Sequence, residues 1–351
     1  MMPPASAPPS PAPAPRPADT LPADAVVGGL AFHRLLFARQ RRGWWTPLAV
    51  AGIGVVLYGI LMVVTVIVII AVASSDPTVL DRLLALSENP TIDVRDPFVL
   101  ALTLGTIVMM LPCYVIASRI VNGKRLGLIS SAAGRLRWGW MMRCVLVALA
   151  LYGVFVAISF LLPSESGADA AVSAPPTSVW VTSLVLILVL VPVQSATEEY
   201  VFRGYLMQSI GRWLRHPAWA ILLPVPLFVL GHLYDVLGQI NVGVFAIAAG
   251  WLSWRTGGLE AAIALHVVNN LTGFLVSLVA GTDPAASETG LFSFVTSLLL
   301  MGGFVAIVEW MIRRKPLPRT LVLTPPAPPA PPVGAVWTPP VWPEPDPATR
   351  A

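Results

Sequence analysis

Charged residues are scarce in this sequence: they make up only 11% of its 351 residues, against roughly 25% in an ordinary soluble domain. Hydrophobic residues account for 56%. A water-soluble fold of this length could not hide so much apolar surface. The composition therefore predicts an integral membrane protein whose first partner is the lipid bilayer.

Cysteine is nearly absent as well. The chain has two, Cys113 and Cys144, and both lie in or beside apolar runs. Their spacing predicts neither a disulfide framework nor a cysteine-bound metal. The net charge of +4 would suggest a nucleic-acid partner in a soluble protein. Here the basic residues flank apolar runs, so we interpret them as topology signals and expect no nucleic acid.

Proline is concentrated in the two ends of the chain. Residues 1–30 and 316–351 are rich in Pro and Ala, and proline at that density favours polyproline II or disorder over helix. We expect disordered tails flanking a helical domain at 31–315. The stretch PAPPAPP in the second tail could bind a partner with a proline-recognising groove.

Long apolar runs fill the interval between the tails. A bilayer core of about 30 Å needs about 20 helical residues, and about eight runs approach or exceed that length. Because backbone groups in lipid must be paired internally, each run is predicted to be a helix, which gives an all-α polytopic membrane protein. The predicted limits are 47–74, 98–121, 139–162, 179–197, 217–235, 240–256, 259–281 and 291–312.

The basic residues alternate with the predicted helices. If each run crosses once, nearly all of them lie on one side, and the acidic residues gather on the other with only Arg82 and Arg95 as exceptions. The positive-inside rule then places both termini in the cytoplasm of a multi-pass cell-membrane protein. The residues on the basic side are Arg34, Arg39, Arg41, Arg42, Lys124, Arg125, Arg135, Arg137, Arg203, Arg212, Arg215, Arg255, Arg313, Arg314 and Lys315.

The stretch SATEEYVFRGY places three charges at the end of the fourth run. On a helix, Glu199 and Arg203 are four residues apart in the orientation that favours an ion pair. Glu198 points about 140° away from Arg203 and is left without that partner. A carboxylate left free in a low-dielectric site is suited to act as a general base. The alternative is an interfacial ion pair at a helix end.

Two further motifs place histidines in apolar runs. In FVLGH, Phe228 precedes His232 by four residues, so its ring could pack on the imidazole and fix its orientation. In HVVNN, Asn270 lies one turn beyond His266, and Asn269 is close to the same face. Each histidine alone would more often be structural. A free carboxylate and two histidines on three membrane helices favour a functional cluster.

EEYVFR, FVLGH and HVVNN, in this order, resemble the motifs EExxxR, FxxxH and HxxxN of the CPBP intramembrane protease family. That family includes CAAX prenyl endopeptidases and bacteriocin-processing or immunity proteins. The resemblance covers about 178–312 and implies endopeptidase chemistry within the bilayer. The matching positions are Glu198, Glu199, Arg203, Phe228, His232, His266 and Asn270.

What the resemblance implies about roles leaves two versions open. In one, Glu198, His232 and His266 hold a zinc ion with a position left for water. In the other, no cofactor is needed, and Glu198 and His232 polarise the water. His266 and Asn270 then donate to the oxyanion. The metal-free version is favoured because Asn270 is a better donor than zinc ligand. In both, Glu199, Arg203 and Phe228 support the site.

The predicted limits conflict with a shared site. Glu198 would lie at the cytoplasmic end of its helix, about 30 Å from Ser178, whereas His266 would be about 12 Å deep. Straight helices with these limits keep the two apart. The conflict makes the limits more suspect than the motifs, and a kink at Pro224 and Pro226 or a longer fourth helix could remove it.

Two other classes of function fit part of the pattern. One is a non-catalytic membrane scaffold or immunity protein that retains the polar residues for packing. The other is a proton-coupled transporter, which the lack of an inverted repeat between the two halves makes less probable. For a protease, the sequence suggests a membrane-associated peptide or protein that enters from the cytoplasmic side. The residue usage is typical of a GC-rich bacterium, which argues against a prenylated substrate.

Overall fold

The computed structural model describes residues 21–88, 93–159, 175–281 and 289–323. Its elements in chain order are the 3-10 helix η2 (Ala23–Ala25), β1 (Leu30–Ala31), the 3-10 helix η3 (Phe32–Ala38), α1 (Thr46–Ser75), α2 (Pro77–Glu88), α3 (Pro97–Val108), α4 (Met110–Asn122), the 3-10 helix η4 (Leu126–Ile129), α5 (Trp138–Ser159), α6 (Thr177–Glu199), the π-helix η5 (Tyr200–Leu206), α7 (Met207–Trp213), α8 (Pro217–Leu222), α9 (Val225–Leu230), α10 (Val236–Thr256), α11 (Glu260–Ala280), α12 (Leu291–Arg314) and β2 (Thr320–Leu321). The predicted all-α class is confirmed.

Seven helices in the described part of the chain are long and apolar enough to cross a bilayer. They are α1, α3 with α4, α5, α6 with η5 and α7, α10, α11 and α12. Their outer side chains are apolar and open: Val55 of α1, for example, is 71% exposed. Lipid is the environment that covers such a surface at no cost, so the protein is a multi-pass membrane protein.

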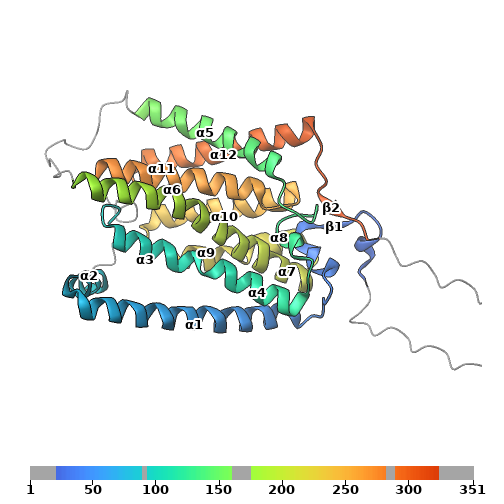
Figure 1. The fold of residues 1–351 in the computed structure, drawn as a ribbon. Coiled ribbons are helices and arrows are strands. Elements are labelled where there is room, and N and C mark those ends of the chain that lie inside the picture. Colours follow the sequence, from blue (N-terminus) through green and yellow to red (C-terminus); the bar gives the residue numbers. More distant parts are fainter. Residues whose placement is uncertain (1–20, 89–92, 160–174, 282–288, 324–351) are drawn as a thin grey trace, which may run out of the picture.

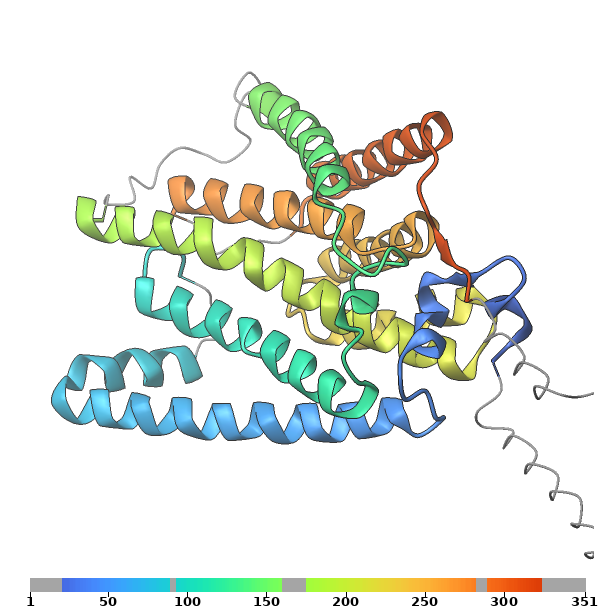
Figure 2. The same ribbon diagram turned by 45° about the vertical axis from the view of Figure 1, so that its right-hand side comes forward.

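The helix α11 lies at the centre of the bundle. It packs against α5 and α6 and also contacts α10 and α12. Small residues let these backbones approach closely, since Ala261 and Ala264 of α11 and Ala249 of α10 are fully buried. The two views show α1 at one edge of the bundle and α5 with α12 at the opposite edge (Figures 1 and 2).

The fourth predicted run ends too early at residue 197. In the structure, α6, η5 and α7 form one 37-residue helical element from Thr177 to Trp213. It continues about 22 Å beyond Glu198 at 1.5 Å per residue. Glu198 therefore lies inside the bundle and not at its end, which removes the reason for expecting it at the cytoplasmic face.

The fifth predicted run, 217–235, is not one continuous helix. It forms the short helices α8 and α9, because Pro224 and Pro226 lack the N–H donors that a continuous helix would need. The chain from α9 to α10 is not helical. This broken segment still runs alongside α10, with Ile221 at the level of Gly250 and Val229 at the level of Gly243.

The connections between helices still alternate between the two ends of the bundle, although the fifth predicted helix is broken. Because the broken segment runs antiparallel to α10 along its length, it moves the chain from one end of the bundle to the other as a helix would. The remaining predicted limits differ by a few residues. The exceptions are a short break at Met109 between α3 and α4, and positions 160–162 of the third run, which lie outside the described residues.

The first and last described segments of the chain meet at the end of the bundle where α5 begins and α10 and α12 end, here called the basic end. Leu30 pairs with Leu321 in an antiparallel ladder between β1 and β2 (Figure 1). The Arg137 side chain donates two hydrogen bonds to the fully buried Glu260 and one to Pro318 O, and its backbone N–H donates a third to Glu260. Ordered structure therefore extends past the predicted limits 31 and 315, while 1–20 and 324–351 lie outside the described residues.

Candidate functional site

The helix that carries the two glutamates is irregular on both sides of them. Pro192 lies within α6 and cannot donate to the carbonyl one turn earlier. Directly after Glu199 the helix widens into the π-helix η5. Such π segments cost regular hydrogen bonding and occur frequently at functional sites. Local sequence thus places Glu198 and Glu199 between two departures from α geometry.

Glu199 is fully buried and connects two cationic or ionisable groups. Its Oε1 accepts a hydrogen bond of 2.8 Å from Arg203 Nη1 and lies 2.7 Å from His266 Nδ1. Arg203 also donates to Ala246 O at 3.0 Å, and its guanidinium lies 4.6 Å from the centre of the Phe228 ring. The predicted pairing of Glu199 with Arg203 is confirmed. A carboxylate at Nδ1 requires the proton on that nitrogen, so Nε2 of the neutral ring is an acceptor.

Glu198 faces the other nitrogen of the same imidazole. Its Oε1 accepts a hydrogen bond of 2.7 Å from Gln194 Nε2, one turn earlier on α6. Its Oε2 lies 3.4 Å from His266 Nε2 and has no hydrogen-bond partner although it is buried. Two acceptor atoms that face each other in this way can both be satisfied by one water, which has two O–H donors.

The polar contacts continue from Gln194 across three helices. Asn270 Nδ2 lies 3.4 Å from Gln194 Oε1, and Asn269 Nδ2 donates to Asn270 Oδ1 at 3.1 Å. Tyr152 on α5 donates to Asn269 Oδ1 at 2.9 Å. Sequence reasoning missed Gln194 and Tyr152. The signal for Gln194 was its place one turn before Glu198, on the same helix face.

The predicted contact between Phe228 and His232 is confirmed, although α9 ends between them. The ring centroids are 4.7 Å apart, and His232 Nδ1 lies 2.8 Å from Phe228 O. Phe228 also contacts the His266 ring at 6.2 Å. It therefore separates the two histidines and supports both.

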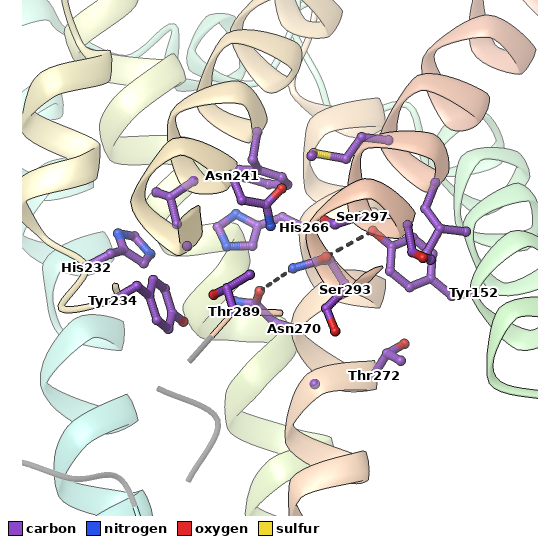
Figure 3. A pocket seen from close by; sticks show the side chains of 18 of the residues that line it. Tyr152, His232, Tyr234, Asn241, His266, Asn270, Thr272, Thr289, Ser293 and Ser297 are labelled. Atoms are coloured by element: carbon purple, nitrogen blue, oxygen red, sulfur yellow. Dashed lines mark hydrogen bonds between the residues drawn. The ribbon is translucent and has the colours of Figure 1, made fainter. Parts of the chain in front are cut away.

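These residues surround a cavity of about 400 Å³. His266 and Asn270 lie between His232 with Tyr234 on one side and Tyr152 with Ser297 on the other (Figure 3). The cavity wall includes His232, His266 and Asn270 but not Glu198, which lies behind His266. The described lining residues carry no Asp, Glu, Lys or Arg.

The residues do not fit the zinc site of the first version. Among the described residues, no group of three His, Cys, Asp or Glu side chains is arranged to hold a metal ion. His266 has one nitrogen against Glu199, and His232 has one nitrogen against a backbone carbonyl. We therefore derive no step through a metal, and the cofactor stays a prediction to be tested.

Comparison with known proteins agrees with the motifs. Residues 180–272 match the family model described as type II CAAX prenyl endopeptidase Rce1-like. The matched segment contains all of the predicted site residues, from Glu198 to Asn270. The resemblance to the CPBP family is confirmed.

The CPBP match is local. An uncharacterized protein of Bacillus subtilis (strain 168), YyaK, is 30% identical over 100 residues, which are 26% of this chain and 33% of that protein. The chain thus covers about a third of the length of this curated relative. No solved structure matches the chain. The CPBP assignment supports a CAAX-type intramembrane protease at the level of the family.

Proposed function

We propose that the protein is an intramembrane endopeptidase that hydrolyses a peptide bond of a membrane-associated protein or peptide. The observation that carries this proposal is the unpartnered Glu198 Oε2, which is buried 3.4 Å from Nε2 of His266, a residue of the cavity wall. A scaffold gains nothing from a buried acceptor left unsatisfied, because that costs free energy. An enzyme, in contrast, gains a binding site for its water from such an acceptor.

In the proposed reaction, Glu198 and His266 act together on one water. The pair accepts a proton from the water, whose oxygen attacks the carbonyl carbon of the substrate. Glu199 at Nδ1 stabilises the imidazolium when His266 holds the proton. The proton then passes to the leaving amine as the C–N bond breaks.

Asn270 and His232 differ in the roles that the contacts favour. The Nδ2 group of Asn270 has only a weak contact at 3.4 Å, and Asn270 lines the cavity, so this group is the candidate donor to the oxyanion. His232 donates from Nδ1 to a carbonyl, which leaves Nε2 as an acceptor. We therefore assign His232 to substrate binding and place His266, not His232, beside Glu198.

Cleavage of quenched membrane-peptide substrates by the purified protein in bilayers tests the proposal, with and without a zinc chelator. We expect hydrolysis that survives the chelator. Loss of hydrolysis in chelator, restored by zinc, would support the metal version of the site. A protein that binds the peptides without cleaving them would support the non-catalytic alternative.

The position of the cavity suggests the side from which substrate enters. Most of the helical residues that line it belong to the half of each helix that is remote from the basic end, such as Tyr152 of α5, Asn241 of α10, Thr272 of α11 and Ser293 of α12. The lining side chains also become more exposed with distance from the basic end, from the buried His266 to the exposed Ser293. If the basic end and both termini are cytoplasmic, substrate enters from the opposite side of the cell membrane. This replaces the cytoplasmic entry suggested by the sequence, which depended on Glu198 lying at the end of its helix.

Thiol labelling checks this orientation without any activity. The free cysteines Cys113 and Cys144 are buried, so the wild type is a low-background reference. We expect a membrane-impermeant thiol reagent to label Ser293→Cys in right-side-out vesicles. The matched variant Lys124→Cys, exposed at the basic end, should be labelled in inside-out vesicles. Labelling of Ser293→Cys only in inside-out vesicles would reverse the proposed entry side.

Both Pro-rich tails leave the bundle at the basic end, because β1 and β2 pair there. A cytoplasmic partner that binds proline-rich peptides could thus contact both at once. Pull-down with an SH3-type domain would detect such a partner. Equal binding to a chain that lacks 324–351 would show that PAPPAPP is not its site.

A further inference from the structure

A second cavity lies at the basic end, away from the glutamates. It has a volume of about 350 Å³ and is named here the basic cleft. Two connections form most of it, the one after η3 and the one after α4. Its lining residues are Ala38, Arg39, Gln40, Arg42, Lys124, Arg125 and Leu323. Four of these seven side chains are cationic, and none is acidic.

Arg39 is the unusual member of the cleft. Its side chain is only 2% exposed, and burial lowers the pKa of its guanidinium below the usual range. Its Nη atoms donate to Ser118 Oγ, Ser118 O and Gly123 O, at the carboxyl end of α4. Its Nε has no hydrogen-bond partner. Within the described residues Arg39 forms no salt bridge, so a buried cation is compensated only by one hydroxyl and by backbone carbonyls.

Two of the neighbouring cations also lack acidic partners within the described residues. Neither Lys124 nor Arg125 forms a salt bridge there, and Arg125 donates to Ala38 O. Lys124 is exposed. The cleft therefore concentrates positive charge around a buried guanidinium, an arrangement that an anion with several acceptor oxygens would stabilise.

The cleft lies beside the ends of two spanning elements, which is where lipid headgroups surround a membrane protein. It is formed where α1 begins at Thr46 and where α4 ends at Asn122, both of them spanning elements. Trp44 and Trp45, which precede α1, are exposed, and exposed tryptophans at the ends of spanning helices are typical of the membrane interface. An anionic lipid headgroup can therefore reach the cleft while its lipid stays in the membrane leaflet.

We infer that the basic cleft binds the phosphate group of an anionic lipid. Phosphate offers acceptor oxygens to Arg39, Lys124 and Arg125 together, and the cleft is open at headgroup level. This inference does not depend on the proposed peptidase reaction, because the cleft shares no residue with the catalytic cavity.

Native mass spectrometry of the full-length protein with added phosphatidylglycerol or phosphatidylcholine tests the inference. We expect phosphatidylglycerol to be retained in preference. The variant Lys124→Gln should weaken its binding about five-fold, because it removes one of the three cations that contact the phosphate in the cleft, each contributing about 1 kcal/mol. The matched control Arg135→Gln removes the same charge from an exposed position on the same connection, outside the cleft, and should leave binding unchanged.

The thermal midpoint in bilayers separates the two sources of phosphate. We expect phosphatidylglycerol to raise the midpoint of the wild type more than that of Lys124→Gln, and inorganic phosphate in phosphatidylcholine bilayers to leave both unchanged. A rise with inorganic phosphate would replace the lipid by a soluble anion and overturn the assignment. Equal retention of both lipids, or equal weakening by the two variants, would also overturn it.

Discussion

Replacing Glu198 by glutamine is expected to lower kcat/KM for peptide cleavage by about 10² to 10⁴, the contribution of a positioned acid-base group. The amide has the same shape as the carboxylate, but it cannot accept a proton from water. Its oxygen can still accept from Gln194, and its NH₂ can donate to His266 Nε2, 3.4 Å from the present Oε2. The fold should therefore be kept, which separates loss of chemistry from loss of structure.

The matched control is Glu88→Gln, the same substitution at an exposed position of α2. Cleavage by this variant should equal that of the wild type, and the thermal midpoints of both variants should stay close to the wild-type value. Normal cleavage by Glu198→Gln would contradict a role for Glu198 in proton transfer. It would instead favour His266 as the general base, supported by Glu199.

Local spacing was sufficient to predict several contacts of the site. The ion pair between Glu199 and Arg203 and the packing of Phe228 on His232 each join residues four apart. Such pairs meet whenever the chain turns as a helix, whatever surrounds them. The order of the motifs likewise predicted that separate helices would contribute, because each motif lies in its own apolar run.

The limits of the helices could not be obtained in the same way. Hydropathy ends an apolar run at the first charges, so the fourth run stopped at residue 197 although the helix continues to Trp213. The charges at Glu199 and Arg203 neutralise each other within the protein, and a helix can continue through a pair that is satisfied in this way. The charged residues of the site thus caused the fourth helix to be predicted too short. The same error caused the conflict between the expected depths of Glu198 and His266.

Contacts between residues far apart along the chain could not be predicted from the sequence either. Nothing in the local pattern shows that His266 lies between Glu198 and Glu199, since this depends on how α11 packs on α6. The assignment of Glu198 with His232 was therefore made without the packing that separates them. Gln194 was passed over because a single amide in an apolar run gives no pattern of its own.

Replacing Arg203 by glutamine is expected to cost about 3 to 5 kcal/mol of stability, because it leaves a buried charge without its partner. Glu199 is fully buried, and among the described residues its other contact is His266. The loss should appear as a large fall in the thermal midpoint of the purified protein in bilayers. The control is Arg313→Gln, which breaks a 2.8 Å pair with Glu309 where the arginine side chain is 75% exposed. That change should cost no more than about 1 kcal/mol.

The variant Arg203→Lys separates charge from geometry. Lysine keeps a cation near Glu199, but one ammonium on a flexible stem cannot reproduce the planar guanidinium that bonds Glu199 and Ala246 O and lies over the Phe228 ring. Its midpoint should fall between those of Arg203→Gln and the wild type. Cleavage should fall further than stability alone explains, because Glu199 would no longer be held where it fixes the tautomer of His266. A lysine variant with wild-type cleavage would mean that only the charge at position 203 matters.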